Sequence, residues 1–340
     1  MNVQKLEALP PPPGIVNSLK TGFDVVSGHV VLILMPLVLD IFLWLGPRLS
    51  VSDLLDPMYK AVFEQARLSM VSANDVKRLV AFQDLFNELL QRFNLFSVIS
   101  RLQTFPIGVS SLAAKVMPEN SPLGIQNIVQ VSSLAGLLGY MFLLVLIGWM
   151  VGGLYFRWVS GIVLGDAKHE AEIGYGRAIV QTFILSVIWF VALIIISVPI
   201  ILVIMALTFI SPTLASGALF VMLLLSFWLI VPVFFTPHGI FIRNQNALYS
   251  IYTSLRMARF TLPTSGMFVF SVFILSTGLN YLWSVPASDS WMMLTGIAGH
   301  AFITTALLAA SFAYYHDMNV WLQIVFEQLQ QKKGAPAGSV

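Results

Sequence analysis

The sequence contains no cysteine and has few charged residues. Without cysteine there are no disulfides, thiolate metal sites or cysteine nucleophiles. Charged side chains make up only 10% of the chain, whereas soluble domains carry about 25%. The formal net charge is +2, which gives no indication of nucleic acid or another polyanion as a partner. A surface this poor in charge cannot face water everywhere.

Apolar residues make up 57% of the chain, and they gather in long runs separated by polar patches. A helix needs about 20 apolar residues to cross a bilayer. In lipid each span must satisfy its own backbone hydrogen bonds, which favours α-helices. We therefore predict an all-α polytopic membrane protein with six transmembrane helices, interfacial amphipathic helices and a helical outer loop domain.

Proline, glycine and polar stretches divide the chain. The predicted segments are a cytoplasmic leader and surface helix (1–27), a first span (28–46), an extracytoplasmic helical loop (47–130), a five-helix membrane domain (131–315) and a cytoplasmic tail (316–340). Spans two to six are expected at about 131–156, 179–209, 215–236, 264–284 and 291–315. Because no apolar run precedes residue 28, we expect the first span to be a signal anchor rather than a cleaved signal peptide.

The outer loop 47–130 is polar and nearly neutral. Helical patterns cover 53–70, 74–94 and 95–105, with a further turn or two in 107–117. Asn74 is the expected N-cap of the second helix. Because a connection of this length needs its own structure or a function, we predict a helical cap and consider it a binding region for a protein partner.

Basic residues in the short loops indicate the orientation. The expected membrane-interface anchors are Lys20, Arg157, Arg177, Arg243, Arg256 and Arg259. With six spans, these residues, Lys168 and both termini fall on the cytoplasmic side of a bacterial cell membrane. Trp44, Trp283 and Trp291 would then form part of an aromatic belt at the outer ends.

The second span is rich in small residues. Ala135 and Gly139 form one small-xxx-small pair, and Gly148 and Gly152 form another. Such pairs let helix backbones approach closely, so we predict helix packing at these positions. Prolines also fall within spans, where packing kinks and broken transport helices are both possible.

Asp40 is the most informative polar residue because it lies inside the first span. A charge at the centre of a span costs roughly 2.5–3.5 kcal/mol on insertion scales, so Asp40 should face protein or water. His300 and Asn280 lie at comparable depth in the outer half of the sixth and fifth spans. Two hypotheses remain open: an intramembrane proton or cation site, or a structural interhelical hydrogen bond.

Three surface segments share a pattern of a small residue, an aliphatic residue and an aromatic residue, with a base in the first and third. They are 18–23, 178–183 and 254–260, each before an outgoing span. The pattern favours three duplicated hairpin units, although any interfacial helix suits such residues.

The stretches ALYSIYTSLRMARF and TALLAASFAYYHD, together with the six-span layout, resemble YciC-like bacterial membrane proteins and the membrane domain of some glycerophosphodiester phosphodiesterases. The matching part is roughly 170–317. The resemblance implies an integral membrane module without established chemistry.

The sequence offers no catalytic or cofactor-binding constellation and no spacing of histidines suited to a metal. GIVLGD, at 161–166, is only superficially similar to an aspartyl protease motif. We therefore expect a non-enzymatic structural or accessory module that contacts membrane lipid and has no nucleic-acid partner. The alternative is a small-solute or ion transporter or channel working near Asp40. The oligomeric state and any substrate do not follow from the sequence.

Overall fold

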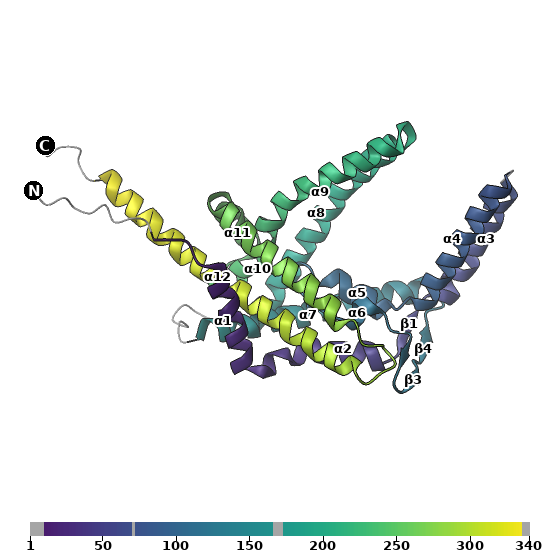
Figure 1. Cartoon of the computed structure of the whole chain (residues 1–340), viewed down its shortest axis with the longest axis horizontal. Helices are drawn as coiled ribbons and strands as arrows, with labels where there is room; N and C mark the ends of the chain where they lie inside the picture. Colours follow the sequence, from purple (N-terminus) through teal and green to yellow (C-terminus); the bar gives the residue numbers. More distant parts are fainter. Residues whose placement is uncertain (1–9, 70–71, 166–172, 335–340) are drawn as a thin grey trace, which may run out of the picture. The chain divides into compact units, whose positions relative to one another are not determined.

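The computed structural model describes residues 10–69, 72–165 and 173–334 (Figure 1). Within these ranges the chain is almost entirely helical, with two short two-stranded ribbons. The all-α prediction is therefore confirmed. The start of the leader, the end of the tail, Lys168 and the aspartate of GIVLGD lie outside the described residues.

The first part of the chain runs from α1 (Ile15–Gly28) through the 3-10 turn η1 (Val30–Ile33) to α2 (Leu34–Leu45). The predicted surface helix and first span correspond to these elements. The backbone leaves the helical conformation at His29, where φ is −135° and ψ is 61°.

The segment 47–130, predicted to be an outer loop, begins and ends in a parallel pair of strands, β1 (Arg48–Ser50) and β4 (Ile128–Gln130). Between them lie α3 (Ser52–Ser69), α4 (Ala73–Arg92), α5 (Leu95–Gln103), α6 (Ala113–Val116) and the antiparallel strands β2 (Asn120–Ser121) and β3 (Gly124–Ile125). The expected helices are close to the observed ones. The strands were not predicted, because each has only two or three residues.

Helices α3 and α4 form a hairpin (Figure 1). Tyr59 and Phe63 of α3 pack against Phe86 of α4 with ring centroids 4.9 and 6.4 Å apart. The predicted N-cap at Asn74 is wrong: Ser72 is the cap, and its side chain accepts a hydrogen bond from the backbone N–H of Asn74.

The remaining helices are long and apolar. They are α7 (Leu134–Leu164), α8 (Tyr175–Ile210), α9 (Pro212–Phe234), α10 (Thr236–Arg243), α11 (Ala247–Trp283) and α12 (Met293–Gly334). Among the described residues, α7, α8, α11 and α12 are each long and apolar enough to cross a membrane. Two pairs of shorter helices, in 15–45 and 212–243, raise that number to six if each pair is one broken span.

Several predicted boundaries are wrong in the same way. The stretch 247–260 is predicted to be a separate surface helix, but α11 continues through it into the apolar stretch that follows. Likewise α7 runs past Arg157, and α12 runs from the sixth span into the tail. At a rise of 1.5 Å per residue, the 37 residues of α11 span about 55 Å, well beyond the roughly 30 Å hydrocarbon core. A polar surface composition therefore does not mark the end of a helix here.

The chain forms two compact units. Unit 1 comprises residues 1–29, 157–275 and 305–340, and unit 2 comprises 30–156 and 276–304. The core of unit 1 is an aromatic cluster that includes Phe235, Phe268 and Tyr314. The rings of Phe268 and Tyr314 are stacked at 4.1 Å.

All three predicted repeat segments contribute to unit 1, and they are buried at equivalent positions. Ser18, Ala178 and Ser254 at the start of each segment are buried. The residue four positions later, Gly22, Thr182 or Ala258, is buried as well. Gly22 is required by this packing, because a Cβ there would lie 2.3 Å from the carbonyl oxygen of Ala306. The shared burial pattern agrees with the duplication hypothesis, which stays a prediction.

Candidate functional site

Asp40 lies on the buried face of α2 and has no exposed surface. Leu32, Pro36, Leu43 and Trp44 are buried with it, at helical spacing along η1 and α2. Because Asp40 lies on this buried face, its carboxylate must find its hydrogen-bond partners inside the protein.

Residues 111–114, in the segment between α5 and α7, supply those hydrogen bonds. The Ser111 hydroxyl donates to Asp40 Oδ1 at 2.5 Å, and the Ala113 backbone N–H donates to the same oxygen at 2.9 Å. The Ser111 oxygen also accepts from the N–H of Ala114 at 2.9 Å. Asp40 Oδ1 therefore fixes the start of α6. Its partner Ala113 belongs to an apolar cluster that also contains Leu112 and Ile297.

His300 faces the other oxygen of the carboxylate. Its Nδ1 lies 3.3 Å from Asp40 Oδ2, within ion-pair distance but not aligned for a hydrogen bond. Its Nε2 lies 3.4 Å from the Ser110 hydroxyl. His300 has no exposed surface either. Asp40, Ser110, Ser111 and His300 form what we call the Asp40 cluster, in which α2 and α12 meet the outer segment.

Asn280 is not part of this cluster. Its side-chain nitrogen donates to the Ser276 hydroxyl one turn earlier on α11, at 3.3 Å. The structure thus brings together two of the three residues singled out from the sequence. The similar predicted depth of the three residues in their spans gave no information on which faces of the helices would be in contact.

Trp44 and Trp283 both pack against other parts of the protein, and their place in an aromatic belt stays a prediction. Trp44 is fully buried, donates from Nε1 to the Ser288 carbonyl at 2.7 Å, and packs edge-on against Trp291 at 5.9 Å. Trp283 lies against Gly299, where an added Cβ would come 2.6 Å from the indole ring. Gly299, beside His300, is therefore a close-packing position that the search for small-xxx-small pairs missed.

The small residues predicted to pack helices behave differently from one another. Gly148 and Gly152 accommodate the outer segment: an added Cβ at Gly148 would collide with the Gln103 side chain, and one at Gly152 would come 2.9 Å from Gly108. Ala135 and Gly139 are exposed. The predicted close approach is thus found at one of the two pairs, where α7 packs against the end of α5 and the loop that follows it.

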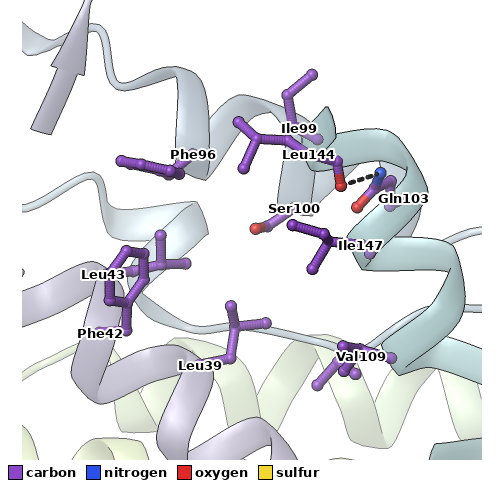
Figure 2. A pocket seen from close by; sticks show the side chains of 12 residues that line it. Leu39, Phe42, Leu43, Phe96, Ile99, Ser100, Gln103, Val109, Leu144 and Ile147 are labelled. Carbon is purple, nitrogen blue, oxygen red and sulfur yellow. Dashed lines mark hydrogen bonds between the residues drawn. The ribbon is translucent and has the colours of Figure 1, made fainter. Parts of the chain in front are cut away.

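A cavity of about 370 Å³ lies on another side of α2 (Figure 2). Its lining comes from three elements and the loop after α5: Leu39, Phe42, Leu43, Phe96, Ile99, Ser100, Gln103, Val109, Leu144, Ile147, Gly148 and Val151. Leu39 lines it while the neighbouring Asp40 does not. The helix thus presents its acid to residues 111–113 and its leucines to the cavity.

The predicted interface anchors are partly engaged with the protein itself. The Arg157 side chain donates to the Ile173 carbonyl at 2.6 Å, and its guanidinium lies 3.5 Å from the Tyr175 ring centroid. Arg177 donates to the Asn244 carbonyl at 2.8 Å.

The other four anchors lie on α1, α10 and α11. Arg243 donates to Asn319 at 3.2 Å, and the Arg256 guanidinium lies 5.8 Å from the Phe326 ring centroid. Lys20 and Arg259 are exposed.

Two buried polar residues were not recognised from the sequence. His238 is buried in the aromatic core of unit 1, where Nε2 lies 2.8 Å from the Ser311 hydroxyl. Arg48 is buried in β1, donates to the Gln91 carbonyl, and has its pKa lowered by desolvation, partly offset by the charge of Glu119. A histidine three residues after the paired aromatics Phe234 and Phe235 was the available signal for the first. No sequence signal identifies the second.

These features define a helical protein with at least four helices, in the described part of the chain, that are long and apolar enough to cross a membrane, and with a buried carboxylate–imidazole pair. Within the same residues, no group of three histidine or acidic side chains could hold a metal ion. No family model, curated protein or solved structure matches the chain.

Proposed function

We propose that this chain is a six-span protein of the bacterial cytoplasmic membrane that acts as a non-enzymatic structural or accessory module. Its N- and C-termini would be cytoplasmic and its helices α3 and α4 extracytoplasmic. The resemblance to YciC-like membrane proteins belongs to this proposal, since it implies the same kind of module.

The observation that carries the proposal is the complete burial of Asp40 and His300. An acid that serves transport must be reached by water or by the transported ion. Asp40 and His300 are both 0% exposed, and Asp40 Oδ1 already accepts two hydrogen bonds from Ser111 and Ala113. This supports a structural role in which the carboxylate ties the outer region to α2, and it does not favour the alternative of a transporter.

The α3–α4 hairpin is the proposed partner-binding surface. Phe82, Leu85 and Leu89 share one face of α4 and are each more than half exposed. Met58 and Val62, one turn apart on α3, are exposed to a similar degree. Exposed apolar patches on a segment outside the membrane are typical of protein–protein interaction sites.

Affinity purification of the full chain from its native membranes tests this proposal. We expect a stoichiometric protein partner that is lost in a Leu85→Ser, Leu89→Ser double variant and retained in an Asp84→Ser control, which changes the exposed residue directly before Leu85. Circular dichroism checks that the variants keep their helices. A chain that copurifies with no partner, but that moves an ion or a solute across reconstituted vesicles, would contradict the proposal and favour the transporter.

A further inference from the structure

The cavity between α2, α5 and α7 has the properties of a hydrocarbon-binding site. Its volume of about 370 Å³ falls in the range of small-molecule sites, which are about 300–1,000 Å³ and mainly apolar. Apart from Ser100, Gln103 and Gly148, its lining residues are aliphatic or aromatic. Cavities with apolar walls favour apolar ligands over water.

The few polar groups of the lining are arranged to leave the interior apolar. The Gln103 side-chain nitrogen donates to the Leu144 carbonyl at 3.2 Å, across the α5–α7 contact (Figure 2). Its amide oxygen lies against Gly148, which has no side chain to displace it. Ser100 points into the space between Leu39 and Ile147 (Figure 2).

The residues at the rim of the cavity indicate whether the cavity opens to water or to lipid. Phe42 of α2 and Ile147 of α7 line the cavity and are 42% and 43% exposed, whereas Leu43, Ile99 and Val109 behind them are buried. A large apolar rim residue exposed to water would be unfavourable at both positions. On α7, the exposed apolar surface continues along a helix long and apolar enough to cross a membrane.

We propose that this cavity binds one acyl chain of a membrane phospholipid, which enters between Phe42 and Ile147. The inference rests on the proposed membrane location of α2 and α7, but not on the proposed protein partner. The ligand class follows from apolar walls, a mouth on the apolar surface and a floor closed by buried aliphatic residues.

Native mass spectrometry of the full chain, purified in mild detergent, tests the site. The wild type is expected to retain one phospholipid. Ser100→Phe places an aromatic ring in the cavity and should reduce retention at least tenfold, whereas Ser100→Ala keeps the space and should retain the lipid. Leu102→Phe is the matched control, because Leu102 lies on the same helix and is 69% exposed.

A second measurement does not depend on the folding of a variant. The wild-type chain is reconstituted in vesicles containing a phospholipid with a photoreactive diazirine in its acyl chain. After illumination we expect adducts on residues 96–103 that an excess of unlabelled phospholipid suppresses. Adducts spread evenly over the exposed apolar helices, or equal lipid retention in Ser100→Phe and Leu102→Phe, would overturn the proposal. Loss of the protein partner in the hairpin variant should leave both readouts unchanged.

Discussion

Replacement of Asp40 separates a carboxylate that is needed as a hydrogen-bond acceptor from one that is needed as a charge. Asp40→Asn keeps an acceptor oxygen in place for Ser111 and Ala113 and removes the negative charge. Asp40→Leu introduces a side chain of similar size and removes both the acceptor oxygen and the charge. Val38→Leu, on an exposed position of the same helix, is the control for the added leucine.

The expected magnitudes follow from the two hydrogen bonds to Oδ1. The Ala113 N–H is fixed by the start of α6, and in Asp40→Leu it is left buried without an acceptor. Each stranded buried donor costs about 1–3 kcal/mol, so Asp40→Leu should lose about 3 kcal/mol of stability, allowing the Ser111 hydroxyl to rotate to another partner. Asp40→Asn should lose about 1 kcal/mol, and Val38→Leu should stay within about 0.5 kcal/mol of the wild type.

Thermal unfolding in one detergent, followed by circular dichroism, gives the order of stabilities. We expect the wild type and Val38→Leu to be most stable, Asp40→Asn to be slightly less stable, and Asp40→Leu to be clearly the least stable. In a double-mutant cycle, Ser111→Ala should cost much less in Asp40→Leu than in the wild type, because its acceptor is already gone. The reasoning would be refuted by an Asp40→Leu variant as stable as the wild type. Equal losses in Asn and Leu would show that the charge, and not the acceptor, stabilises the fold.

The remaining predictions concern packing and orientation. Gly22→Ala places a Cβ 2.3 Å from the Ala306 carbonyl oxygen and should destabilise the protein by about 1–3 kcal/mol. Gly176→Ala is the control, because its Cβ meets nothing within 4 Å, and it should be neutral or stabilising. A melting temperature that is higher for Gly22→Ala than for Gly176→Ala would contradict the packing of α1. Because the chain has no cysteine, Thr21→Cys and Ser69→Cys each introduce a single thiol on an exposed position. A membrane-impermeant thiol reagent applied to intact cells should label Ser69→Cys and not Thr21→Cys, and the reverse pattern would invert the proposed orientation.

The helical fold was predictable because apolar length and helical periodicity are properties of the local sequence. The helices of the outer loop were placed within a few residues, since residues such as Asp75 and Phe86 follow capping and amphipathic patterns. Helix ends were harder to predict where a polar surface stretch joins an apolar span. In α11 the two are one continuous helix, while the chain breaks at His29, and no residue type distinguishes the two cases.

The candidate site was predictable in part. Burial of Asp40 followed from the cost of exposing a charge to lipid, and His300 was one of two partners at the right depth. The main hydrogen-bond donors, Ser111 and the backbone of Ala113, could not be inferred, because they depend on how the outer loop folds back onto α2. Neither could the burial of His238, which depends on aromatic residues contributed by distant helices.

The structural role proposed for Asp40 requires that the buried pair of Asp40 and His300 does not face an aqueous path. Ser111→Cys replaces one hydroxyl of the cluster by a thiol of similar shape, and it is the only thiol in the chain. In native membranes, a small charged methanethiosulfonate should leave this thiol unmodified, while it modifies Ser69→Cys rapidly and modifies Ser111→Cys only after denaturation. Modification of the folded Ser111→Cys variant at a rate comparable to that of Ser69→Cys would show that water reaches Asp40 and would contradict the structural role proposed for it.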